Sequence, residues 1–194
     1  TLYIDDEHLA IEAVATSSEL KHERLNCIKS IYENSPKIIV THIAAFLKPI
    51  LSFNEFIKGI VKFEVGKEID IDEITSVLIK AGYKRVATTY NVGEFSVRGE
   101  VLDIYPVCLT DPVRINFAFD EVETIKYFDL STQLSKEKID EVNIYPMNEL
   151  IIWDDYNDLK KKLESIDKSN NEVLDKDFSD LIEFNNIDKM NKYI

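Results

Sequence analysis

The chain contains 194 residues with 36 acidic and 23 basic side chains, which give a formal net charge of −13. Because a nucleic-acid interface needs Lys and Arg to neutralise phosphates, this charge disfavours DNA or RNA as a direct partner of the segment and favours proteins. No run of about 18 apolar residues is present, so no membrane span is expected.

The start of the chain and its cysteines add expectations about its origin. Thr1 and the residues after it have neither the basic nor the apolar segment of a signal peptide, and the missing initiator Met indicates a fragment of a longer protein. Cys27 and Cys108 are isolated, which is typical of a reducing cytosol. We therefore expect a cytoplasmic protein without a disulfide scaffold.

The N-terminal part of the chain has the pattern of an α/β layer. Residues 7–33 carry apolar side chains at helical spacing. A short apolar run at 37–41 predicts a buried strand of a parallel sheet. A further helix begins at residues 44–47 and is ended or kinked by Pro49.

From residue 51 the pattern changes to that of an α+β domain. A short helix at 53–60 and a strand at 61–65 precede a helix that starts at Asp70, where a carboxylate favours the positive end of the helix dipole, and stops at Gly82. The residues that follow alternate mostly with period two, which predicts a compact antiparallel sheet. The expected strands are 84–90, 94–98, 100–105, 113–119, 122–128 and 139–145.

The tail beyond Pro146 is strongly charged. Residues 154–166 have the pattern of a helix, residues 167–177 are polar and predict a mobile loop, and the last residues again predict a helix. No internal repeat is present in the chain.

Motifs for nucleotide or metal chemistry are missing from the sequence. A phosphate-binding loop needs a glycine-rich turn with Lys before Ser or Thr, and the five glycines form no such pattern. The three histidines have no partner at metal-ligand spacing. The acidic residues Asp120, Glu121 and Glu123 could hold a divalent ion in a nuclease-type enzyme, but a tight turn with an exposed strand face is the favoured explanation.

Arginines gather in one stretch of a chain whose other basic residues are lysines. Arg85, Arg98 and Arg114 lie close in sequence, and only Arg24 is remote. If the predicted strands pair, the three guanidiniums could share one sheet face with Phe95. Such a face would suit a protein partner, because Arg and aromatic side chains are enriched at binding hot spots. The alternative is three separate surface ion pairs of little energetic value, and composition does not decide between them.

Ordered motifs within residues 82–149 resemble the Mfd family, the bacterial transcription-repair coupling factors, in a region that these proteins share with the excision-repair protein UvrB. The upstream segment also resembles the family, and the tail after residue 150 is weakly covered. The stretch at 131–135 favours Mfd over UvrB. The motifs are Ala81–Arg85, Gly93–Gly99, Asp103–Pro106, Pro112–Ile115, Phe119–Ile125 and Phe128–Ser135.

This resemblance implies a fold of the class α/β plus α+β. Residues 1–50 and 150–194 would form part of a UvrB-like, degenerate helicase-type α/β domain. Residues 51–149 would form an inserted α+β domain with a mixed, largely antiparallel β-sheet. In this family the inserted domain carries the surface that binds the UvrA repair protein.

The resemblance also implies a function. The full-length protein would be an ATP-dependent DNA translocase that displaces RNA polymerase stalled at lesions and recruits UvrA for nucleotide excision repair. This segment would be non-catalytic and without a cofactor, because ATP and magnesium would bind the motor domains. RNA polymerase and DNA would contact other domains, and no membrane would be involved. The alternatives are a fragment of UvrB or, from another class, a metal-dependent nuclease-type enzyme.

The residues of the site follow by position in the family motifs. The two glycines that bracket Arg98 are expected to allow tight turns or a close backbone approach, and no catalytic or metal-binding residue is expected. The expected UvrA contacts are Arg85, Phe95, Arg98 and Arg114, and the expected structural residues are Gly93, Gly99 and Pro106.

Overall fold

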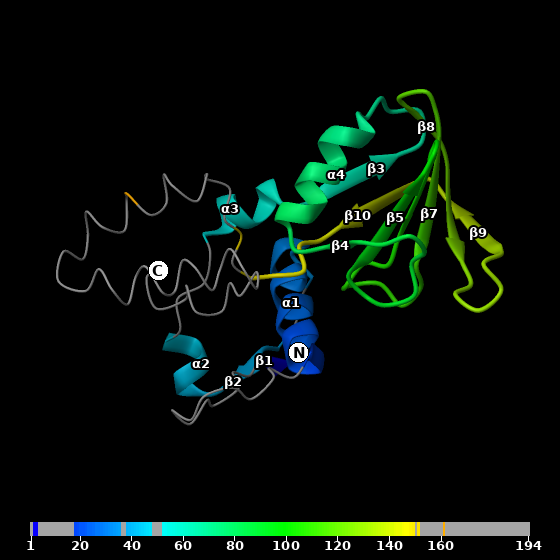
Figure 1. Cartoon of the computed structure of the whole chain (residues 1–194). Coiled ribbons are helices and arrows are strands. Elements are labelled where there is room, and N and C mark those ends of the chain that lie inside the picture. Colours follow the sequence, from blue (N-terminus) through cyan, green and yellow to red (C-terminus); the bar gives the residue numbers. More distant parts are fainter. Residues whose placement is uncertain are drawn as a thin grey trace.

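The computed structural model describes residues 2–3, 18–35, 38–47, 52–149, 151 and 161. Figure 1 shows a curved sheet with a helix beside it, next to a smaller group of helices and short strands from the N-terminal part. Nearly all of the helix predicted at 154–166 and the whole loop predicted at 167–177 lie outside the described residues. None of the described helices is long and apolar enough to cross a membrane.

A six-stranded sheet forms the body of the molecule. Neighbouring strands pair antiparallel except the first two, β4 and β5, which run parallel. The prediction of a mixed, largely antiparallel sheet is confirmed. In spatial order the strands are β4 (Lys84–Arg85), β5 (Glu94–Arg98), β6 (Val101–Ile104), β7 (Val113–Ala118), β8 (Glu121–Phe128) and β9 (Ser135–Ile139).

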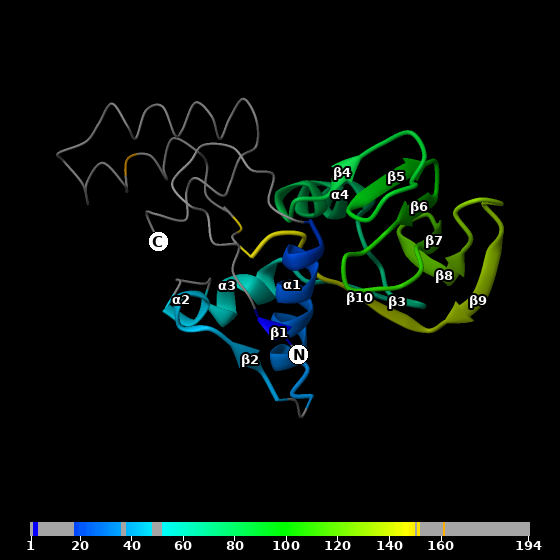
Figure 2. The same cartoon turned by 90° about the horizontal axis from the view of Figure 1, so that it is seen from below.

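A second sheet and a helix pack with the large sheet. Strands β3 (Val61–Glu64) and β10 (Glu141–Ile144) pair antiparallel, and helix α4 (Ile71–Lys80) lies beside the strands in both views (Figures 1 and 2). Their apolar side chains join those of the large sheet in one core. Fully buried members of this core include Phe63, Leu78, Phe95, Ile115 and Ile125.

Alternation along β7 shows how the sequence separates the two faces of the large sheet. Val113, Ile115 and Phe117 are buried in the core, whereas Arg114 and Asn116 between them are only partly buried. Successive side chains of a strand point to opposite faces. The large sheet therefore has an apolar face toward α4, β3 and β10, and a polar face on the other side.

Both ends of α4 lie where the sequence predicts them. The Asp70 side chain accepts hydrogen bonds from the backbone N–H groups of Asp72 at 2.8 Å and Glu73 at 3.1 Å, which makes it the N-cap. At the other end Gly82 has a φ of 94°, a conformation that glycine adopts without steric cost. Local signals therefore fix this helix.

The N-terminal part contains helices α1 (Ser18–Tyr32), α2 (Ile43–Leu47) and α3 (Phe53–Lys58). It also contains a small parallel sheet of β1 (Leu2–Tyr3) and β2 (Val40–Thr41).

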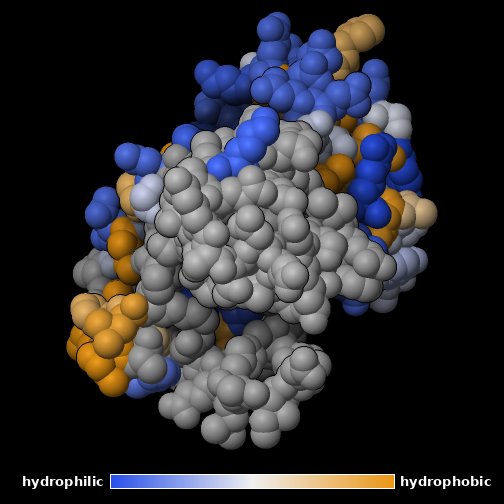
Figure 3. Space-filling model, turned by 60° about the vertical axis from the view of Figure 1, so that its left-hand side comes forward, coloured by the Kyte–Doolittle hydropathy of each residue, from blue (hydrophilic) through white to orange (hydrophobic). Residues whose placement is uncertain are grey.

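The strand predicted at 37–41 is shorter than expected and is not buried. Ile38 is 83% exposed and Val40 57% exposed, because among the described residues β2 has only β1 beside it. Figure 3 shows apolar side chains gathered at the lower edge of the molecule, at the height of α2 and β2 in Figure 1. A UvrB-like helicase-type domain in this part stays a prediction.

A second apolar cluster joins the N-terminal helices to the body. Leu25 of α1 and Phe56 of α3 pack with Val107 and with Tyr145, which follows β10. Polar contacts also connect the segment after β10 to α1. Arg24 forms an ion pair with Glu149. Lys21 donates a hydrogen bond to Asn148, and the Tyr145 hydroxyl donates one to Glu33. Helix α1 is thus anchored on the segment that leaves the sheet.

One strand prediction is wrong in extent, and one strand was not predicted. The strand expected at 84–90 covers only β4, because the chain then forms a loop in which the buried Thr89 hydroxyl lies 3.2 Å from the Asp103 carbonyl. Strand β9 was not expected, because its sequence Ser-Lys-Glu-Lys-Ile does not alternate and it is almost wholly exposed at the sheet edge. The strand expected at 139–145 is β10.

Candidate functional site

The polar face of the large sheet carries a row of side chains in register across five strands. Ser96 of β5 pairs with Asp103 of β6, Asp103 pairs with Arg114 of β7, and Arg114 pairs with Lys126 of β8. Lys126 in turn pairs with Lys138 of the edge strand β9. Residues opposite each other on neighbouring strands lie on the same face, within reach of one another. We call this surface the arginine face.

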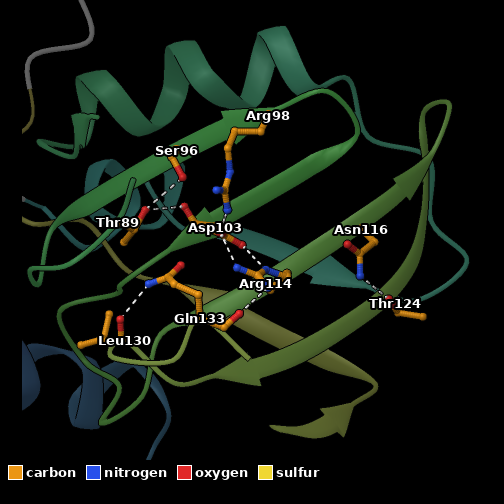
Figure 4. A network of polar contacts seen from close by, with 9 residues as sticks. All are labelled: Thr89, Ser96, Arg98, Asp103, Arg114, Asn116, Thr124, Leu130 and Gln133. Carbon is orange, nitrogen blue, oxygen red and sulfur yellow. Dashed lines mark hydrogen bonds and ion pairs between the residues drawn. The ribbon is translucent and has the colours of Figure 1, made fainter. Parts of the chain in front are cut away.

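Asp103 is the centre of this face. Its side chain is 1% exposed, and Figure 4 shows the guanidiniums of Arg98 and Arg114 converging on it. Arg114 binds it with two N–H groups, from Nε to Oδ1 at 2.6 Å and from Nη2 to Oδ2 at 2.9 Å. Arg98 Nη2 donates to Oδ2 at 2.5 Å. A buried carboxylate needs such compensation, since an unpaired buried charge is costly.

Arg114 contacts two further protein groups besides Asp103. Its Nη1 donates to the Gln133 carbonyl at 3.0 Å, and its guanidinium lies 4.8 Å from the centre of the Phe128 ring. The hydrogen bond to Asp103 raises the pKa of Arg114 above its ordinary value. Only 16% of its side chain is exposed, so most of its donors serve the protein itself.

Arg98 is the accessible member of this group. Its side chain is 48% exposed, and a single hydrogen bond from Nη2 connects it to the described part of the chain. The other N–H groups of the guanidinium are therefore available to a partner. It stands at the end of β5, where Gly99 at a φ of 60° begins a two-residue hairpin loop, the position that a type II′ turn reserves for glycine.

Arg85 and Phe95 do not belong to this group. Phe95 is fully buried in the core, so the expectation that it lies among exposed arginines is wrong. The strand alternation explains this, because Phe95 has the opposite orientation to Ser96 and Arg98 on the same strand. Arg85 is paired in register with Phe95, which places it on the other face of the sheet, at the edge strand. The hypothesis of three guanidiniums on one face therefore fails for Arg85.

Two of the expected structural residues, Gly93 and Pro106, lie at the opposite end of the β5–β6 pair from Arg98. Gly93 has a φ of 84° and is hydrogen-bonded through its backbone to Tyr105 and Lys84, and a Cβ there would lie 2.6 Å from the Met147 Cε atom. Pro106 is buried directly after this strand pair, and its carbonyl accepts a hydrogen bond from the Leu109 N–H at 3.3 Å.

The other candidates for chemistry have local roles. Asp120 accepts a hydrogen bond from the Ile69 N–H at 2.7 Å through its carbonyl, which ties the acidic turn to the loop before α4. No group of three or more His, Cys, Asp or Glu side chains suited to a metal ion occurs among the described residues. Burial raises the pKa of the Cys108 thiol to about 11, which keeps it protonated and weakly nucleophilic.

Sequence reasoning missed Asp103 as a partner of the arginines. In a two-residue hairpin after Arg98, residues 96 and 103 are opposite each other, so a carboxylate at 103 is diagonal to Arg98 on the same face. That register could have been derived from Gly99. The contacts of Arg114 with Phe128 and Gln133 join residues that are distant in sequence. No local sequence pattern predicts them.

The sequence of residues 61–150 matches the family model described as the UvrB interaction domain. Among curated relatives, the transcription-repair-coupling factor of Borreliella burgdorferi is 36% identical over 162 residues, which cover 82% of this chain and 14% of the relative. That of Bacillus subtilis is 34% identical over 151 residues, 78% of this chain and 13% of the relative.

That of Staphylococcus haemolyticus is 33% identical over 139 residues, 72% of this chain and 12% of the relative. The chain therefore spans only a small part of the length of these proteins. The matched family, the relatives and the mixed sheet agree with the resemblance found in the sequence. The chain belongs to the family of transcription-repair-coupling factors, the Mfd family, and corresponds to their N-terminal, UvrB-like region.

Proposed function

We propose that this region is a non-catalytic docking module that recruits UvrA to sites where RNA polymerase has stalled. The observation that carries the proposal is Arg98, a half-exposed guanidinium fixed by a buried carboxylate on the polar face of a UvrB interaction domain. Arginine in a defined orientation is well suited to charge-assisted recognition of a carboxylate. The name of the domain family supports a repair protein as the partner.

The charges of the face support an acidic partner surface. Asp103 neutralises one of the two guanidiniums beside it, so the group of Arg98, Asp103 and Arg114 retains one positive charge. Lys126 and Lys138 extend that charge along the register row. In a chain with a net charge of −13 this is a local reversal of sign, which favours one docking orientation over others.

The four residues expected from the sequence receive different roles in this proposal. Arg98 is the central contact. Arg114 has an indirect role, because it binds the same carboxylate, Asp103, as Arg98. Arg85 lies on the other face of the sheet, so it would contact the partner only around the exposed edge strand β4. Phe95 has no contact with the partner and stabilises the core.

For the full-length protein we propose the activity implied by its family. It would be a cytoplasmic, ATP-dependent DNA translocase that acts in nucleotide excision repair. Its other domains would contact RNA polymerase and DNA, and its motor domains would bind ATP and magnesium. This segment would contribute recruitment alone.

The proposal is tested by calorimetric titration of purified UvrA with the 194-residue chain. We expect Arg98→Glu to abolish binding, because it places a carboxylate where the partner's own carboxylate would bind. The matched control is Lys67→Glu, the same charge reversal in the exposed loop between β3 and α4, which we expect to bind like the wild type. Circular dichroism checks the fold of both variants. Unchanged affinity of Arg98→Glu would refute the docking role.

The nuclease-type alternative is tested by titrating the chain with Mg²⁺ and Mn²⁺ while NMR signals are followed. The docking proposal predicts no saturable shift at Asp120–Glu123. A saturable, site-specific shift there would favour the metal-dependent enzyme. The same experiment with ATP should give no saturable shift, since the sequence has no phosphate-binding loop.

A further inference from the structure

We propose that Asp103 is a positioning residue of the arginine face: its buried carboxylate presets the orientation in which Arg98 meets a carboxylate of the partner. This inference rests on the proposed docking function and deepens it. Asp103 is 1% exposed and therefore has almost no surface with which to touch a partner. Any effect it has on docking passes through the two guanidiniums that it binds.

The geometry separates the roles of the two arginines. Arg114 makes the bidentate pair with Asp103, which by itself compensates the buried charge. Arg98 adds one further hydrogen bond to Oδ2, an oxygen that already accepts from Arg114. Arg98 is thus the surplus cation, and it is the one whose side chain is 48% exposed.

The long side chain of Arg98 must be restrained in the free protein if it is to bind a partner with little loss of conformational entropy. A free arginine loses rotamer freedom when an interface immobilises it, and this lowers affinity. In the free protein the bond from Nη2 to Asp103 already restricts the guanidinium. Its remaining N–H groups then face the partner in one arrangement, as a bidentate carboxylate contact requires.

Asp103 in turn is fixed by its strand. Its backbone pairs with Ser96 on one side and Arg114 on the other, and its carbonyl lies 3.2 Å from the Thr89 hydroxyl. Arg114 is fixed independently by Phe128 and by the Gln133 carbonyl. The residues that hold Arg98 in place therefore come from four strands, β5 to β8, and two loops, and this arrangement exists without any partner.

The test is a double-mutant cycle on the 194-residue chain with UvrA as titrant. Arg98→Ala should weaken binding about tenfold or more in the wild-type background and less than about threefold in the Asp103→Asn background, because an unpositioned Arg98 contributes little. Asn116→Ala, on the same face, serves as the control background and should leave the cost of Arg98→Ala unchanged. Equal costs of Arg98→Ala in the wild-type and Asp103→Asn backgrounds would overturn the proposal.

A second measurement needs no UvrA. NMR relaxation of the Arg Nε–Hε groups in the free wild-type chain should show Arg98 as more ordered than Arg85, which has no ion pair among the described residues. Asp103→Asn should remove that order. If Arg98 were as mobile as Arg85 in the wild type, the proposal would be wrong even if UvrA bound tightly. If UvrA failed to bind while Arg98 was ordered, only the docking function would fail.

Discussion

The sheet body and the N-terminal segment 38–47 differ in how their apolar residues are used. In β7 every second residue is buried, and the strand has a core on one face and polar groups on the other. In 38–47 the apolar residues form two consecutive runs, 38–40 and 43–47, and Ile38, Ile43 and Phe46 are 83%, 71% and 72% exposed. A two-faced strand needs one covering layer, whereas a run of consecutive apolar residues needs two. The sheet body therefore buries the apolar face of its strands with its own elements, whereas the large apolar side chains of the N-terminal segment stay exposed.

The largest test of this comparison replaces one phenylalanine in each region. Phe95→Ala should lower the free energy of unfolding by about 3–5 kcal/mol, because the ring is fully buried in the core. Phe46→Ala should change it by less than about 0.5 kcal/mol, since the ring is exposed. Urea denaturation followed by circular dichroism measures both, with Phe95→Leu as a milder variant if Phe95→Ala does not fold. Similar losses for Phe46 and Phe95 would show that the N-terminal segment has its own core.

The same difference explains how far the sequence could predict the structure. Strands with regular alternation, such as β5 and β7, were found within one residue of their observed ends, because alternation and hairpin turns are local signals. Strand β9 was missed, since a polar edge strand is defined by its neighbour and not by its own residues. The domain boundaries predicted at residues 51 and 149 stay predictions.

The site was predictable to a similar degree. The choice of the candidate site near Arg98 followed from composition and the family motifs, and its function stays a prediction. The face on which each side chain lies required strand register, and there the sequence reading placed Phe95 and Arg85 incorrectly. Register also depends on the irregularity in β8 and on the short parallel pairing of β4, which no local pattern reveals.

The junction between the two regions gives the next prediction. Arg24 is 8% exposed and donates to both oxygens of Glu149. Arg24→Ala should cost about 1–3 kcal/mol of unfolding free energy, because it leaves the Glu149 carboxylate without its charged donor. Lys62→Ala, which removes an exposed pair with Glu141, should change the urea midpoint little. If Arg24→Ala were equally harmless, α1 would belong to the N-terminal region and not to the body.

A smaller effect is expected at the glycines that flank β5. Gly93→Ala and Gly99→Ala both force a non-glycine residue into a positive φ, which costs about 1–2 kcal/mol. Gly93→Ala should cost more, since its Cβ would lie 2.6 Å from the Met147 Cε atom, whereas nothing lies within 4 Å at Gly99. Equilibrium unfolding of the two variants compares them. Equal losses would show that Met147 moves away freely, and that the body is less tightly packed at this loop than the contacts indicate.

The smallest effect concerns a loop of the body that is stabilised locally. Hydrogen bonds from the Ser131 hydroxyl, and from the backbone and hydroxyl of Thr132, lower the pKa of Asp129 below its ordinary value. A carboxyl group whose pKa is lowered in the folded state adds stability above its unfolded-state pKa of about 3.9, and this is lost as the pH falls through the folded-state pKa.

Asp129→Asn should therefore lower the urea midpoint at neutral pH, and its difference from the wild type should shrink progressively below about pH 4. Asp140→Asn is a suitable comparison, because it replaces another exposed carboxylate in a turn of the same body. A difference for Asp129→Asn that persisted unchanged into strong acid would mean that the amide disturbs the loop sterically. The turn that positions Gln133 beside Arg114 would then depend on packing with the sheet. In that case the hydrogen bonds within the loop would not be what stabilises it.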